Sequence, residues 1–153
     1  MEIERKFLIN EFPSNLSEIE RADMYQAYLS TNPVVRIRKK SKQGENSYKL
    51  CIKGEGTLVR EEVEFSISED EFLRLSNIIN NKFIHKEFRT YKLENYILEC
   101  SKVDFNGKNE FYYAEIEFNS VEEANNFTAP EFLKNEVTEK TGYTMKDYWE
   151  RNI

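Results

Sequence analysis

The first nine residues bring together side chains that could bind a metal ion and an anion. Read as a strand, in which successive side chains point to opposite faces, they place Glu2, Glu4 and Lys6 on one face. Carboxylates bind hard divalent cations through oxygen, and an ammonium group binds phosphate oxygens. An ordinary half-buried strand with a solvated outer face shows the same alternation, so this segment alone leaves both interpretations open.

Several later segments repeat the alternation of charged and apolar residues. Arg36 and Arg38 share one face of their segment, as do Glu115 and Glu117 of theirs. A surface that carries both signs fits a complex of a divalent metal ion with a polyphosphate, because the metal ion prefers carboxylates and the phosphates prefer cations. Pooled over all segments, the charged face holds Glu2, Glu4, Glu62, Glu64, Glu99, Glu115, Glu117, Lys6, Arg36, Arg38, Lys49, Lys53, Arg60, Lys86 and, at a less regular spacing, Arg89.

The elements that must position these residues are mostly strands. We expect strands at residues 1–9, 22–29, 34–39, 47–53, 60–67, 83–93, 96–103, 111–118 and 136–138, and a turn at 106–109. Capping boxes that begin at Ser68 and Ser120 predict helices over residues 68–81 and 120–127. A last helix is expected over 144–151, with Trp149 anchoring it on the apolar exterior.

So many strands with so few helices favour an α+β fold built on a closed antiparallel β-barrel. A closed barrel has no exposed edges and gives its two faces different environments. An apolar interior is the usual arrangement in a soluble barrel, whereas a charged interior would be a wet channel. Patterning alone leaves open which face points inward.

Length, charge and cysteine content limit the number of domains, the partners and the compartment that we expect. The 153 residues predict one domain, and a formal net charge of −6 argues against nucleic acid as a partner. We expect no membrane span and no removable leader, and therefore a cytoplasmic protein that is a monomer or a homodimer. Cys51 and Cys100 do not form a disulfide framework, and the single His85 argues against a zinc site.

The opening Glu2-x-Glu4-x-Lys6 resembles the E-x-E-x-K signature of the CYTH, or triphosphate tunnel metalloenzyme, superfamily. The resemblance continues, in order, over most of the chain. It rests further on Val35-Arg36-Ile37-Arg38, Ile52-Lys53-Gly54, Arg60-x-Glu62-x-Glu64, Ala114-Glu115-Ile116-Glu117 and Glu136-Val137-Thr138.

The resemblance implies one CYTH-like domain over residues 1–153, folded as a tunnel of about eight antiparallel strands flanked by helices, with the charged face inside. It also implies Mg²⁺- or Mn²⁺-dependent hydrolysis of a linear triphosphate, either inorganic tripolyphosphate or a small organic triphosphate. The alternatives are an adenylyl cyclase of the same superfamily, which makes cyclic AMP from ATP, and a non-catalytic module that binds polyphosphate or nucleotides.

Carried over by position, the resemblance also implies roles for individual residues. The metal ligands would be Glu2, Glu4, Glu115 and Glu117, of which Glu115 would support a second ion or orient the attacking water. Glu62 and Glu64 would, like Glu115, support a second ion or orient the attacking water, and they would act in catalysis together with Lys6. The triphosphate would be held by Lys6, Arg36, Arg38, Lys53, Arg60, Lys86 and Arg89.

Two positions depart from the superfamily pattern. Lys86 and Arg89 are three residues apart, which places them on opposite faces of a strand unless a β-bulge intervenes. Ser101 stands where the superfamily often has an acid, two residues after Glu99. The second metal site is therefore expected to be weak or to be completed by another group.

Overall fold

The computed structural model describes residues 1–105 and 108–152, with side chains for all of them except 105 and 108–110. The strands in these ranges form one 10-stranded antiparallel sheet, in the order β10-β1-β9-β8-β7-β2-β3-β4-β6 with β5 paired to β1. Their bounds are β1 Glu2–Ile9, β2 Glu18–Thr31, β3 Val34–Lys42, β4 Glu45–Lys53, β5 Val59–Arg60, β6 Glu62–Ser66, β7 Ile84–Leu93, β8 Tyr96–Phe105, β9 Lys108–Glu117 and β10 Asn135–Glu136.

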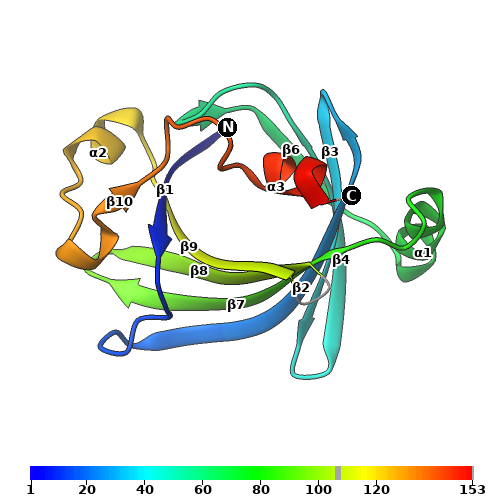
Figure 1. The fold of residues 1–153 in the computed structure, drawn as a ribbon, viewed down its shortest axis with the longest axis horizontal. Helices are drawn as coiled ribbons and strands as arrows, with labels where there is room; N and C mark the ends of the chain where they lie inside the picture. Colours follow the sequence, from blue (N-terminus) through cyan, green and yellow to red (C-terminus); the bar gives the residue numbers. More distant parts are fainter. Residues whose placement is uncertain (106–107, 153) are drawn as a thin grey trace.

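The sheet curls into a nearly closed barrel (Figure 1). Strand β6 pairs with β4 at one end of the order, and β5, separated from β6 only by Glu61, pairs with β1 near the other end. The predicted antiparallel barrel is therefore confirmed. The strand predicted over residues 60–67 is interrupted at Glu61, because β5 and β6 follow different neighbouring strands.

Strand β2 is longer than predicted. It begins at Glu18 and continues its pairing with β7 across a register shift between Glu18 and Glu20. The turn predicted at residues 106–109 falls partly on residues 106–107, which lie outside the described residues, and residues 108–109 belong to β9.

The helices begin where their capping residues predict. Ser68 forms the predicted capping box with Glu71, and the Ser120 hydroxyl accepts a hydrogen bond from the Glu123 amide. Helix α1 packs against β3 and β4, and helix α2 packs against β1. The helical elements are α1 Glu69–Ile78, α2 Val121–Asn126, the 3₁₀ helix η1 Glu131–Leu133 and α3 Met145–Asn152.

The apolar face of most strands points outward, and helices cover part of it, while Val63 and Phe65 of β6 stay exposed. One apolar cluster joins Phe7 of β1 and Ile116 of β9 to Ala124 of α2 and Phe127. The side chains between these positions, such as Lys6 and Glu115, point into the barrel and line a cavity. This arrangement puts the charged face inside, which the composition alone could not decide.

Helix α3 packs against inward-facing residues of the barrel. Met145 and Trp149 are buried there in a cluster with Tyr28, Val34 and Tyr113, which also line the cavity. The rings of Tyr28 and Trp149 lie 5.7 Å apart, and in Figure 1 α3 is seen within the ring of strands. The prediction that Trp149 anchors its helix on the exterior was therefore wrong, since the helix packs on inward-facing residues. None of the helices in the described ranges could cross a membrane.

Candidate active site

The barrel encloses a cavity of about 790 Å³ whose wall is mostly polar. Neighbouring strands contribute cross-strand partners to it: Glu4 lies opposite Glu117, and Lys6 lies opposite Glu115. Almost every residue proposed for the site from the sequence lines this one cavity. They are Glu2, Glu4, Lys6, Arg36, Arg38, Lys53, Arg60, Glu62, Glu64, Lys86, Glu115 and Glu117.

One group of charges is already paired. Lys53 Nζ lies 3.2 Å from Glu2 Oε1 and 3.3 Å from Glu62 Oε2, and Arg60 Nε lies 3.6 Å from the same Glu2 oxygen. Burial raises the pKa of Glu2, and the charge of Lys53 opposes that rise. These residues form a network that joins β1, β4, β5 and β6 where the barrel closes.

A second group consists of carboxylates that lie close to one another. Burial, and then repulsion by Glu115, raises the pKa of Glu4 well above its usual range. Burial also acts to raise the pKa of Glu115, but a hydrogen bond from Glu4 and the charges of Lys6 and Lys86 hold it at about 2. Two carboxylates this close repel each other when both are ionised, and a cation between them would relieve that repulsion.

Glu99 joins this group of carboxylates. It lies opposite Glu115 across β8 and β9. Burial, followed by the charges of Glu115 and Glu117, raises the pKa of Glu99 to about 7. The sequence analysis noted its position on the charged face but gave it no role.

Two buried cations with few partners line the same cavity as these carboxylates. Arg36 is 8% exposed, and its buried Nε has no hydrogen-bond partner among the described residues. Lys86 is 6% exposed and donates to the hydroxyl of Tyr113 at 2.5 Å. Burial, and then the charge of Arg36, lowers the pKa of Lys86 well below its usual range. An anion in the cavity would pair with both cations.

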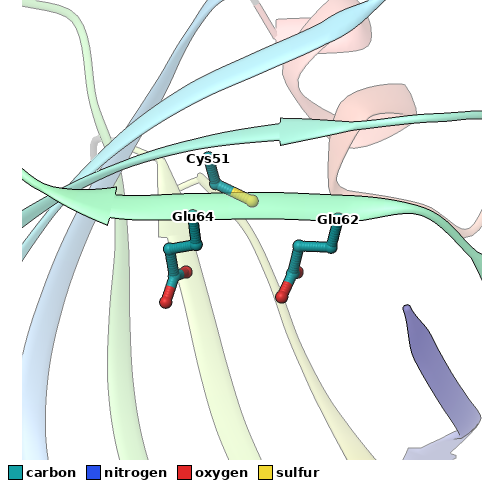
Figure 2. Close-up of side chains that lie close together, drawn as sticks. All are labelled: Cys51, Glu62 and Glu64. Carbon is teal, nitrogen blue, oxygen red and sulfur yellow. The ribbon is translucent and has the colours of Figure 1, made fainter.

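Glu62 and Glu64 project from β6 beside Cys51 of β4 (Figure 2). One donor atom from each of the three lies within 4.8 Å of the others, close enough to hold a cation. The two carboxylates already contact cations, however. Glu64 lies 3.2 Å from Lys49 Nζ and 3.7 Å from Arg38 Nη2, and Glu62 contacts Lys53. Because these ion pairs already occupy them, Glu62 and Glu64 are better placed to orient the neighbouring cations and a water molecule than to form a dedicated metal site.

Comparison with known proteins agrees with this geometry. The CYTH domain family matches residues 1–151. The chain belongs to the CYTH domain family. It is 32% identical over 145 residues to a protein from Nitrosomonas europaea described as an inorganic triphosphatase, covering 95% of this chain and 94% of that protein.

Solved structures show the same CYTH tunnel. The crystal structure of the inorganic triphosphatase NE1496 has a TM-score of 0.66 and 27% identity, with coverage of 97% of this chain and 93% of that one. A protein from Pyrococcus horikoshii, PH1819, has a TM-score of 0.60 at 19% identity, covering 80% of this chain and 81% of that one, and shows the fold alone.

Arg89 differs from the other CYTH motif positions in this chain. Strands β7 and β8 pair without a register shift from His85 to Leu93, so no bulge turns Arg89 inward. Its Nη2 lies 3.3 Å from Glu87 Oε2, and its guanidinium carbon lies 4.1 Å from the ring centroid of Phe12. Arg89 does not line the cavity, which corrects the expectation that it grips a phosphate.

Tyr113 is a member of the CYTH tunnel wall that the sequence analysis missed. Its hydroxyl accepts the Lys86 hydrogen bond, and Lys6 Nζ lies 4.2 Å from its ring centroid. Lys6 Nζ also donates to the Tyr143 carbonyl at 2.6 Å. The sequence did hold a signal for this position: Tyr113 lies two residues before Glu115 and therefore on the same face of β9.

Proposed function

We propose that this chain hydrolyses a linear triphosphate inside its tunnel, with Mg²⁺ or Mn²⁺ as the cofactor. The substrate is inorganic tripolyphosphate or a small organic triphosphate. One observation carries the proposal: the cavity holds crowded carboxylates around Glu4 together with the buried cations Arg36 and Lys86. Crowded carboxylates favour a cation and buried cations favour an anion, so a metal–triphosphate complex satisfies both. The identity to an inorganic triphosphatase supports the same reaction.

The metal ion would be held by carboxylate oxygens of Glu2, Glu4, Glu115 and Glu117. These are hard oxygen ligands of the kind that Mg²⁺ and Mn²⁺ prefer, and the mutual repulsion of Glu4 and Glu115 favours a positive charge between them. When bound, such an ion neutralises the charge of the phosphate oxygens and draws electron density from phosphorus.

The chain's own residues position the substrate and move a proton. The phosphates would be held by Lys6, Arg36, Arg38, Lys53, Arg60 and Lys86. Glu62 or Glu64 accepts a proton from the attacking water while the water oxygen bonds to the terminal phosphorus. The bond between that phosphorus and its bridging oxygen breaks, which releases orthophosphate and leaves a diphosphate. Placement and neutralisation of charge provide most of the rate enhancement in such a reaction.

The experiment is a phosphate-release assay on the full chain with tripolyphosphate, thiamine triphosphate and ATP, each with Mg²⁺, Mn²⁺ or a chelator. We expect metal-dependent release from at least one triphosphate and none with the chelator. Cyclic AMP from ATP would instead favour a cyclase. Tight binding of every triphosphate without any product would instead favour a non-catalytic binding module.

A further inference from the structure

Two of the phosphate-binding cations proposed above converge on one aromatic side chain, that of Tyr113 in β9. Lys86 Nζ, from β7, donates to the Tyr113 hydroxyl at 2.5 Å. Lys6 Nζ, from β1, lies 4.2 Å from the centroid of the same ring, which is within the range of a cation–π interaction. All three side chains line the cavity, so these contacts lie inside the tunnel.

The contacts that Tyr113 makes with the two lysines are neutral. A hydroxyl oxygen and the face of an aromatic ring attract an ammonium group without placing a carboxylate against it. A further hydrogen bond of Lys6, to the Tyr143 carbonyl at 2.6 Å, is neutral as well. Lys6 and Lys86 are therefore fixed in position while a phosphate oxygen can still pair with them.

Tyr113 is itself held firmly. It is 1% exposed, and its ring stacks on that of Phe111 with the centroids 5.9 Å apart. The Phe111 ring in turn lies 5.1 Å from the ring of Tyr148 in α3. The Tyr113 hydroxyl also forms a hydrogen bond with Ser101, which lies opposite it across β8 and β9. A side chain that is fixed on several sides can fix the groups that bind to it.

We propose that Tyr113 is a positioning residue, which holds the Lys6 and Lys86 ammonium groups where they bind the phosphates of the substrate. The inference rests on the proposed triphosphate site, because both lysines act there. Fixing a long, flexible side chain costs conformational entropy, and a lysine that Tyr113 already holds has lost this entropy before the ligand binds. The gain is a tighter complex with the triphosphate.

The test is a double-mutant cycle between Tyr113 and Lys86, made in the full chain with tripolyphosphate and Mg²⁺ or Mn²⁺. Tyr113→Phe removes the hydroxyl that binds Lys86 and keeps the ring. We expect it to raise the KM for tripolyphosphate by about fivefold and to leave kcat within about twofold. In the Lys86→Met background the same substitution should change KM by less than about twofold, because its partner is absent.

Two further variants sharpen the cycle. Tyr113→Leu also removes the ring that contacts Lys6, so it should raise KM more than Tyr113→Phe does and keep an effect in the Lys86→Met background. Tyr112→Phe is the matched control, since Tyr112 is the preceding residue of β9 and faces the other side of the strand. Its ring centroid lies 5.2 Å from that of Phe12, and its substitution should leave KM and kcat unchanged.

An equal rise in KM from Tyr113→Phe in both backgrounds, or an equal rise from Tyr112→Phe, would overturn the inference. So would a loss of kcat and thermal stability in Tyr113→Phe with an unchanged KM, which is the signature of a structural role alone. If the parent chain binds tripolyphosphate but releases no phosphate, the proposed hydrolysis fails. A Tyr113→Phe effect on the calorimetric Kd that requires Lys86 would then still support the inference. If the parent chain does not bind tripolyphosphate, both proposals fail.

Discussion

Strand β1 carries charged residues on both faces, and these residues lie in different environments on the two faces. On the outer face, Arg5 pairs with Glu136 at 2.8 Å and 2.7 Å, and its Nη1 also donates to the Ala124 and Phe127 carbonyls near the end of α2. The hydrogen bond from Arg5 lowers the pKa of Glu136. On the inner face, burial and a second carboxylate raise the pKa of Glu4 well above its usual range.

The difference separates charges that hold the fold together from charges that await a ligand. Arg5 and Glu136 satisfy each other and join β1 to β10 and α2, so they stabilise the folded state by themselves. Glu4 is half-buried beside Glu115 and Glu2, and the repulsion among these carboxylates costs stability until a cation arrives. The paired or crowded state of a carboxylate, rather than its charge or strand position, therefore distinguishes a structural role from a binding role.

The largest expected effect comes from Glu4→Gln. Removing a carboxylate from the metal site should reduce metal-dependent phosphate release by at least about a hundredfold. The melting temperature should stay the same or rise, because a buried charge among like charges is removed. A phosphate-release assay and a thermal melt of the same sample check both, and full activity would remove Glu4 from the site.

Replacement of Lys86 by Met tests the basic side of the tunnel. Loss of a buried cation that faces the ligand should raise the KM for tripolyphosphate by about tenfold. Stability should not fall much, because an apolar side chain of similar length replaces a desolvated ammonium. Steady-state kinetics and urea denaturation separate the two effects, and an unchanged KM would exclude contact between Lys86 and the substrate.

On the outer face, Glu136→Gln should lower stability and leave activity unchanged. We expect a loss of about 1 kcal/mol in the free energy of unfolding at pH 7, below the value for a buried pair because the Glu136 side chain is 36% exposed. Activity per folded molecule should be unchanged.

The pH dependence of that loss follows from the lowered pKa of Glu136. A carboxylate whose pKa is depressed on folding contributes stability above its unfolded value of 4.5, and this contribution disappears as the pH falls through the folded pKa. Urea melts of the parent chain and of Glu136→Gln should therefore converge as the pH falls below 4.5 and through the lowered folded pKa. A stability difference that persists in acid would contradict the charge-based explanation.

The smallest effect is expected for Arg89→Gln. Because Arg89 lies on the outer face of β7, its replacement should change the KM for tripolyphosphate by less than about twofold. Lys86→Met, on the inner face of the same strand, is the comparison. A loss of substrate affinity in Arg89→Gln as large as that in Lys86→Met would mean that the outer guanidinium reaches the ligand.

The sequence predicted the strands well because period-two alternation is a local property of each segment. It also predicted that Lys86 and Arg89 oppose each other, since three residues reverse the face of a strand. Which face points inward was not local: the same alternation suits either arrangement, and only the resemblance to CYTH proteins favoured the charged interior.

Other features depended on contacts between distant segments. A helix with one aromatic anchor can pack on either surface of a barrel, and the apolar exterior was predicted for Trp149. Its burial against Tyr28 depends instead on where the chain enters the barrel. The raised pKa of Glu99 depends on burial in the barrel and on the charges of Glu115 and Glu117 from a neighbouring strand, and no spacing in the sequence signals it.

Helix α3 buries Met145, Tyr148 and Trp149 against the barrel, and Met145 is itself part of the cavity wall. The cavity is therefore bounded at this place by an apolar side chain rather than by a charged one. The position of α3 thus limits how far a charged ligand can be inserted among the strands.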